Sequence, residues 1–332
     1  MFSSTVLAQK TTPITPSQSF VRQLAKEYCS TAYPILSSVN LDPERYSQSS
    51  APADLFKHFS TIVHEDYHIM NHQLNGGHLA DESGVRKYWV HDKLTIEVPK
   101  FEVFNSKLIS TWVPSEISDQ LPSFNTYLLD NYKYQHDAQL NGILGIMEEF
   151  LAYYQGARAY IESFDYLLSN AEQTDPEEWA KYFANAADVY AYYEFQLFIT
   201  WYLEVAKMHH PEVHRAILDN YNFRVLYTVV DDAYGELISR YYENRETAVN
   251  YWTDLGESMY IKHNYLWTQK ADGSGSIGYD LPDRTIRTLK RFQDFHSFDM
   301  IDELRVYDVG MIESGSPSAP HRSTASANAA HR

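Results

Sequence analysis

The chain has one cysteine, Cys29, in 332 residues. A single cysteine excludes an intrachain disulfide and a cysteine-based zinc site. No apolar run approaches the ~18 residues of a membrane-spanning helix, so no membrane span is expected. Basic residues are also scarce: 27 Lys and Arg face 44 Asp and Glu, the net charge is −17, and no basic run occurs. Nucleic acids and anionic membranes, which require clustered basic side chains, are therefore not expected partners.

The composition is otherwise that of a globular protein with a sizeable core. Hydrophobic residues make up 44% of the chain and charged residues 21%, which are ordinary values. Aromatic residues are abundant at 15%, with 27 Tyr among them. Tyrosine combines an apolar ring with a polar tip, which suits helix faces, wet interfaces and substrate clefts.

The two ends of the chain differ from its middle. Residues 1–18 predict a flexible N-terminus, in which Val6-Leu7-Ala8 resembles the end of a signal peptide without its charged and apolar regions. A signal-peptide remnant, which favours a periplasmic or secreted protein over a cytoplasmic one, and a disordered cytosolic N-terminus are both compatible with it. Residues 313–332 predict a disordered tail, because they are rich in Ser, Ala, Pro and Asn. One domain is expected over 19–312.

Apolar residues spaced by three and four positions predict helices over most of this domain. One helix is expected to begin after Ser50 and Pro52 and to continue to about Gln73, where Gly76-Gly77 ends it. Further helices are expected over 19–32, 139–162, 187–208 and 225–242, within a region, 124–265, that is almost entirely helical.

Residues 87–113 instead alternate between apolar and polar. Positions 94, 96 and 98 are apolar and positions 95 and 97 are polar, which predicts two to four short antiparallel strands with one wet face. Residues 273–278 are expected to be a flexible turn, because they contain several glycines. The expected fold is mostly α (α+β), with a small antiparallel sheet inserted between two helices.

The most informative motif is His64-Glu65-Asp66-Tyr67-His68, which reads H-E-x-x-H within an expected helix. Residues four apart on a helix share a face, so both imidazoles can reach one metal ion. Glu65 then lies beside that ion, where it can take a proton from a metal-bound water. These are the parts of a zinc hydrolase.

A catalytic zinc site takes three protein ligands and keeps a fourth position for water. His72 is rotated by about 80° from His64 on an ideal helix, which makes it a poor third ligand, and His78 lies beyond the glycine pair. Glu148 and Glu149 are better candidates. Two adjacent carboxylates in an apolar, aromatic helix are costly unless a partner such as Zn²⁺ satisfies one of them, although they could also be ordinary salt-bridge partners.

The two segments, HEDYH and EEFLAYY, resemble the gluzincin metallopeptidases, the thermolysin-like group. In that group, H-E-x-x-H on one helix is completed by a Glu on a second helix, often within E-x-x-A. Aligned on Ala152, the resemblance implies a zincin-like domain with Glu149 as the third ligand and Tyr153 on the same face. It also implies a Zn²⁺ cofactor and a peptide or protein substrate. A substrate-aligning edge strand would come from residues 87–113.

The chain is thus expected to be a zinc metallopeptidase in which Glu65 activates the bound water and Tyr153 stabilises the oxyanion. Other candidates for the oxyanion group are Tyr154, His209, His210, His214 and Tyr227.

Two alternatives remain at this stage. The first is a non-catalytic zinc-binding or partner-binding protein. The second is a helical di-metal carboxylate oxidoreductase that uses Glu65-x-x-His68, but no second E-x-x-H occurs in the chain. The His210/His214 pair also has metal-ligand spacing, although it lies at a helix start where solvated histidines are common.

Overall fold

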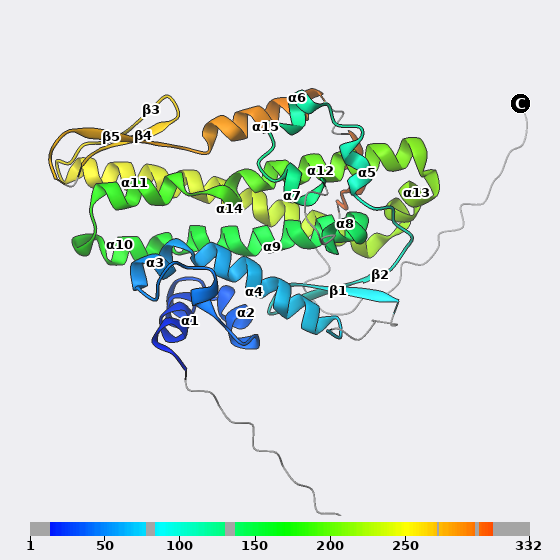
Figure 1. The fold of residues 1–332 in the computed structure, drawn as a ribbon, viewed down its shortest axis with the longest axis horizontal. Coiled ribbons are helices and arrows are strands. Elements are labelled where there is room, and N and C mark those ends of the chain that lie inside the picture. Colours follow the sequence, from blue (N-terminus) through cyan, green and yellow to red (C-terminus); the bar gives the residue numbers. More distant parts are fainter. Residues whose placement is uncertain (1–13, 78–83, 130–136, 271, 296–298, 308–332) are drawn as a thin grey trace, which may run out of the picture.

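The computed structural model describes residues 14–77, 84–129, 137–270, 272–295 and 299–307, and it is mostly helical with two small antiparallel sheets (Figure 1). This confirms the mostly α class. Almost all of the expected N-terminal segment and the whole of the expected tail at 313–332 lie outside the described residues, as does His78. The first helix begins at Pro16, slightly before the expected boundary at residue 19.

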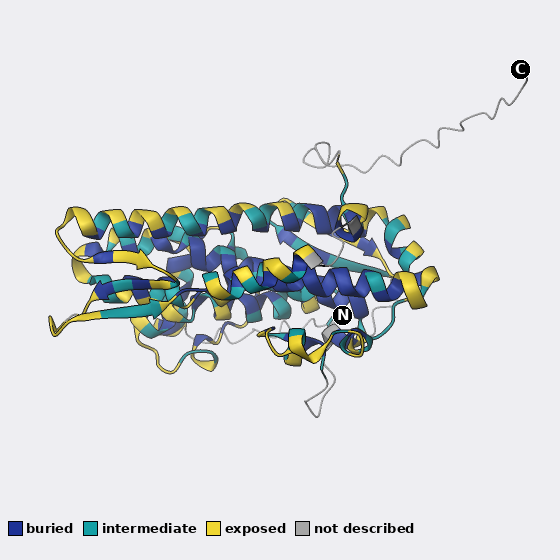
Figure 2. Ribbon diagram, turned by 90° about the horizontal axis from the view of Figure 1, so that it is seen from above, coloured by how far each residue is buried: buried dark blue, intermediate teal, exposed yellow. Residues whose placement is uncertain are grey.

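Three long helices form the centre of the molecule: α9 (Gly142–Glu162), α12 (Ala187–His209) and α14 (Tyr221–Asp254). Helix α12 is apolar on most of its sides, and both α9 and α14 pack against it. Helix α4 (Phe59–Leu74) covers the outer side of α9, and α15 (Asp283–Phe295) covers α12 (Figure 1). Buried residues follow the inner faces of these helices, while the exposed residues face outward (Figure 2).

The single helix expected from Pro52 to about Gln73 is two helices, α3 (Pro52–Lys57) and α4, which is a correction. They are separated at His58, whose backbone leaves the helical region (φ −103°, ψ 11°). The expected end of α4 is correct. Gly76 and Gly77 both have positive φ, and the Gly77 N–H donates to the carbonyl of His72 at 2.9 Å, which satisfies a free carbonyl in the last turn.

The first sheet is a hairpin of β1 (Val85–His91) and β2 (Leu94–Pro99), and it lies in the chain between α4 and α9. Tyr88, Val90, Ile96 and Val98 are buried, whereas the residues alternating with them on β2 are exposed. The expected sheet with one wet face is therefore present.

The hairpin has two strands, and no further strand follows it among the described residues up to 113. In that segment Phe104 stacks on Tyr202 at 4.0 Å, and its backbone N–H and carbonyl both bond to the Tyr202 hydroxyl. A side chain thus satisfies the backbone groups that a third strand would have used.

The second sheet was not expected from the sequence. It consists of β3 (Met259–Lys262), β4 (Tyr265–Gln269) and β5 (Ser276–Asp280) in sequential antiparallel order. The turn expected at 273–278 ends at residue 275, and the remainder belongs to β5. Gly278 lies directly against the indole of Trp267, where an added Cβ would come within about 3.0 Å of ring atoms. This glycine therefore permits close packing within a strand.

The other elements are short and connect or cover the long helices. They are α1 (Pro16–Tyr28), α2 (Ala32–Ser38), η1 (Pro43–Arg45), α5 (Lys107–Ser110), α6 (Ser115–Ser118), α7 (Phe124–Tyr127), α8 (Asp137–Leu140), α10 (Phe164–Ser169), η2 (Ala171–Gln173), α11 (Pro176–Ala184), α13 (Pro211–Asp219) and α16 (Asp299–Leu304). Among the described residues, none of the helices combines the length and the apolar character that crossing a membrane would require.

Candidate metal site

Helix α4 presents His64 and His68 on one face, toward α9. The two rings meet edge to face with centroids 4.9 Å apart, and their Nε2 atoms are 3.3 Å apart. This follows from the i,i+4 spacing of a helix, which places two side chains one above the other. The pair therefore offers two nitrogen lone pairs to the same point in space.

Helix α9 brings Glu149 to this histidine pair. Its Oε2 lies 3.2 Å from His68 Nε2 and 3.8 Å from His64 Nε2. The point in the plane of the three atoms that is equidistant from them is about 2.0 Å from each, and a point slightly out of this plane matches Zn–N and Zn–O distances of roughly 2.0–2.2 Å. Within the described parts of the chain, this is the one group of three His, Cys, Asp or Glu residues with such spacing.

The two helices can place these groups together because they approach closely two turns away. Gly156 on α9 lies over Ser60 on α4, and an added Cβ would come within 3.2 Å of the Ser60 carbonyl oxygen. Ser60, His64 and His68 run along α4 in the opposite direction to Gly156, Tyr153 and Glu149 along α9. The absence of a side chain at Gly156 thus allows the antiparallel packing that brings the carboxylate to the imidazoles.

Burial determines the charge states in this group. Burial, reinforced by the neighbouring His68, lowers the pKa of His64 to about 3, so its imidazole is neutral at physiological pH. Burial acts against ionised Glu149 and protonated His68, but their mutual attraction outweighs it, so the pKa of Glu149 is lowered and that of His68 is raised. The buried carboxylate therefore needs a positive partner, which can be a protonated imidazole or a metal cation.

Glu148 contacts the other side of His68. Its Oε1 lies 3.4 Å from His68 Nδ1, and its Oε2 accepts a hydrogen bond from Arg86 on β1. Imidazoles that bind metals commonly donate their second ring N–H to a carboxylate, which orients the ring. Each ring nitrogen of His68 thus faces a different carboxylate: Nε2 faces Glu149 and Nδ1 faces Glu148.

Glu65, the expected general base, is half-buried on α4 between the two histidines in sequence. Its negative charge contributes to the raised pKa values of His68 and Tyr46.

Tyr153, the expected oxyanion group, packs its ring edge to face on His64 with centroids 4.5 Å apart. Its hydroxyl accepts a hydrogen bond of 3.2 Å from Tyr127, whose hydroxyl also helps to lower the pKa of Glu149. Tyr127 belongs to α7 and had no signal in the sequence, since it is a single tyrosine among many and lies far from both motifs.

The other histidines and tyrosines considered from the sequence have different surroundings. His72 is exposed, outside the three-residue group. His209 packs against Trp112 with its ring tilted, His210 stacks on Phe104, and His214 lies 3.6 Å from Glu303. Tyr154 accepts a hydrogen bond from Arg158, and Tyr227 is fully buried.

The edges of the β1–β2 hairpin are occupied by side-chain amides. Asn75 bonds to both the N–H and the carbonyl of Lys87, and Gln155 donates to the carbonyl of Val90. On β2, two asparagines at the start of α14 donate to the carbonyls of Glu97 and Pro99. A peptide could pair with the hairpin at these positions only by displacing those side chains.

Comparison of the chain with protein-family models, with curated proteins and with solved structures gave no match. The assignment of a function therefore depends on the geometry of the site and on the two motifs.

Proposed function

We propose that this chain is a zinc-dependent hydrolase, a metallopeptidase in which His64, His68 and Glu149 hold the ion. The observation that carries the proposal is the spacing of the three ligand atoms, whose in-plane equidistant point lies about 2.0 Å from each. The resemblance of HEDYH and EEFLAYY to the gluzincin motifs supports the same ligand set. A zincin-like arrangement of the helical domain is part of this proposal.

The donor set suits zinc and a catalytic role. Two imidazoles and one carboxylate are ligands of catalytic zinc sites, which keep a further position for water. Zinc, when bound, lowers the pKa of that water to about 7 and polarises a carbonyl oxygen. The side chains of His68 and Glu149 are 25% and 14% exposed, so the group is mostly buried but is still reached by solvent.

The protein side chains supply the proton transfers. Glu65 takes the proton of the attacking water and later delivers it to the leaving amine. Tyr153 accepts a hydrogen bond from Tyr127, so its own proton is free to stabilise the oxyanion that develops on the substrate carbonyl. The hairpin edges carry other hydrogen bonds, so the substrate is positioned by side chains around the site rather than by adding a strand to β1–β2.

The test is Glu65→Gln in the full chain. Hydrolysis of casein and of a fluorogenic peptide library is expected to fall by about 10²- to 10⁴-fold, because the general base is removed. Zinc content, measured by mass spectrometry after zinc loading, is expected to stay at one ion per chain, because Glu65 is not among the ligands. Glu149→Gln should lose both zinc and hydrolysis.

Glu116→Gln on exposed α6 is the matched control, and it should change neither quantity. Full turnover in Glu65→Gln would refute the catalytic assignment. One tightly bound zinc without hydrolysis of any peptide would instead favour a non-catalytic zinc protein, and bound iron with a visible absorption band would favour the di-metal oxidoreductase.

A further inference from the structure

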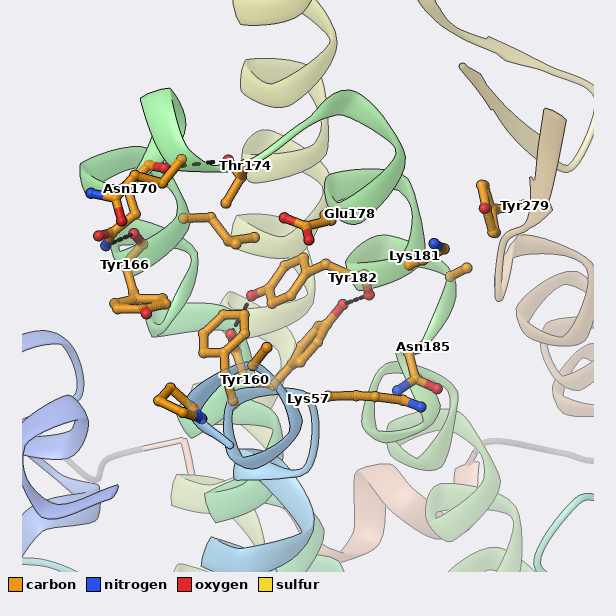
Figure 3. Close-up of a pocket in the computed structure, with 16 residues that line it drawn as sticks. Lys57, Tyr160, Tyr166, Asn170, Thr174, Glu178, Lys181, Tyr182, Asn185 and Tyr279 are labelled. Carbon is orange, nitrogen blue, oxygen red and sulfur yellow. Dashed lines mark hydrogen bonds between the residues drawn. The ribbon is translucent and has the colours of Figure 1, made fainter. Parts of the chain in front are cut away.

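A second feature of the molecule, separate from the metal site, is a cleft of about 680 Å³ at the carboxyl end of α9 (Figure 3). It lies between α3, α10 and α11, and Tyr279 of β5 is at its rim. Tyr160 in the cleft and Glu149 are on the same helix but roughly 16 Å apart along its axis. The volume is within the range of clefts that hold a small organic ligand.

The floor of the cleft is a rigid group of aromatic rings. The ring of Tyr182 stacks on Tyr160, with centroids 4.3 Å apart, and on Phe56, at 5.9 Å, and Phe56 also contacts Tyr166 at 4.8 Å. The hydroxyls of Tyr160 and Tyr182 each donate to the backbone carbonyl of the other residue (Figure 3). The rings of Tyr160 and Tyr182 are therefore fixed in position, and both of their hydroxyl protons are already used.

Polar side chains surround this floor. Lys57, Gln173 and Asn185 line the cleft, and none of them has a side-chain hydrogen bond to another residue of the described ranges. Lys57 belongs to α3 and Asn185 follows the end of α11, so the polar groups come from two different elements around the cleft (Figure 3). Asn170 uses its amide nitrogen on the Tyr166 carbonyl, which leaves its side-chain oxygen to accept a further bond. The rim thus offers both donors and acceptors.

The charges of the lining exclude a strongly anionic ligand. The ammonium of Lys181 is 2.8 Å from Glu177, which neutralises it. Glu178 contributes a carboxylate to the same cleft, opposite in charge to Lys57. A phosphate or a polyanion would meet the ammonium of Lys57 and the carboxylate of Glu178, whose charges cancel, so the cleft has no net positive charge with which to recognise it. A wholly apolar ligand would make no use of the amide groups of the rim, which are exposed on Gln173 and Asn185.

We propose that this cleft binds a neutral oligosaccharide. Sugar hydroxyls donate and accept hydrogen bonds, as do the carboxamides of Gln173 and Asn185. Sugar rings also carry an apolar face of C–H groups, which can pack on the ring of Tyr166. The aromatic floor thus matches the apolar face of a sugar ring, and the polar, nearly neutral rim matches its hydroxyl groups.

The test is calorimetric titration of the full chain with cellotriose, maltotriose, xylotriose and tri-N-acetylchitotriose. Saturable binding of at least one of them is expected. Asn185→Ala should weaken that binding about 3- to 10-fold, the loss expected for one hydrogen bond, and Tyr166→Ala should weaken it further. Asn185 is exposed, so its substitution should leave the melting temperature unchanged even if Tyr166→Ala impairs folding.

Asn40→Ala is the matched control, since Asn40 is exposed and outside the cleft lining, and it should bind as the parent does. The proposal would be overturned if none of the four trisaccharides bound, or if Asn40→Ala weakened binding as much as Asn185→Ala does. It would also be overturned if sialylated trisaccharides or casein peptides bound more tightly than the neutral trisaccharides. The measurement needs no metal, so its result is independent of the hydrolase assignment.

Discussion

Each buried charge of the candidate site is compensated by a particular neighbour. His68 shows this best, because Glu149 faces its Nε2 and Glu148, held by Arg86, faces its Nδ1. A carboxylate at Nδ1 favours the tautomer in which that nitrogen carries the proton, so the lone pair of Nε2 points to the ligand position. Glu148 is thus expected to act as a positioning residue for the metal.

Replacement of Glu148 by Gln should weaken zinc binding about 10- to 100-fold, because the charge that orients His68 is lost. Competition with a chromogenic chelator measures this affinity without any need for catalysis. Glu162→Gln is the matched control, since Glu162 is also on α9 and is bound by an arginine, Arg158, at 3.0 Å. Equal zinc affinity in the parent and in Glu148→Gln would show that Glu148 is only a structural partner of Arg86.

At the scale of the elements, the position of α9 depends on the close approach of its first residue, Gly142, to Phe104 and Tyr202. Gly142 has a φ of +53°, and an added Cβ would lie 2.4 Å from the Phe104 carbonyl oxygen and 2.6 Å from the Tyr202 hydroxyl. The contact joins the start of α9 to α12 through the stacked pair of Phe104 and Tyr202. A side chain here would push α9 away from both.

We therefore expect Gly142→Ala to lower the free energy of unfolding by about 2–4 kcal/mol, the combined effect of overpacking and of a left-handed backbone. Urea denaturation measures the change. Gly256→Ala is the control: Gly256 also has a positive φ, of 85°, but has no atom within 4 Å of an added Cβ. Gly256→Ala should lower the free energy of unfolding by only about 1 kcal/mol, the cost of the left-handed backbone alone. Equal losses in both variants would contradict the close contact of Gly142 with Phe104 and Tyr202.

For the whole molecule, the pH dependence of stability should reflect carboxyl groups buried in the bundle. Glu194 on α12 is fully buried; one oxygen accepts the Ser123 N–H at 2.7 Å, and the other has no partner within the described ranges. Burial raises the pKa of Glu194 from 4.5 to about 7. A raised carboxyl pKa means that the folded state binds the proton more tightly than the unfolded state does.

The contribution of Glu194 is therefore most favourable below about pH 4.5 and is lost as the pH rises through about 7. Glu194→Gln keeps an acceptor for Ser123 and cannot ionise. It should be more stable than the parent by about 3 kcal/mol at pH 8 and nearly equal to it at pH 4. Urea denaturation at several pH values measures the difference, and a difference independent of pH would contradict the assignment.

Much of the helical fold could be predicted from local patterns. Apolar spacing predicted helices near the observed α4, α9 and α12, and alternation predicted the β1–β2 hairpin. The β3–β5 sheet was missed because its strands are only four or five residues long, too short to show a clear alternation, and they are stabilised by pairing with one another. The break at His58 was missed because it depends on how α3 and α4 pack separately on the rest of the molecule.

The sequence alone determined which side chains share a face: His64 with His68, and Glu149 with Tyr153, because the pitch of a helix is a local property. Only the tertiary structure decided that these two faces meet, and in which register. Successive residues on a helix point about 100° apart, so it is the packing of α9 on α4 that directs Glu149 to the Nε2 atoms and Glu148 to Nδ1 and Arg86. The contribution of Tyr127 was likewise set by the fold, since a long segment of chain separates it from the groups it contacts.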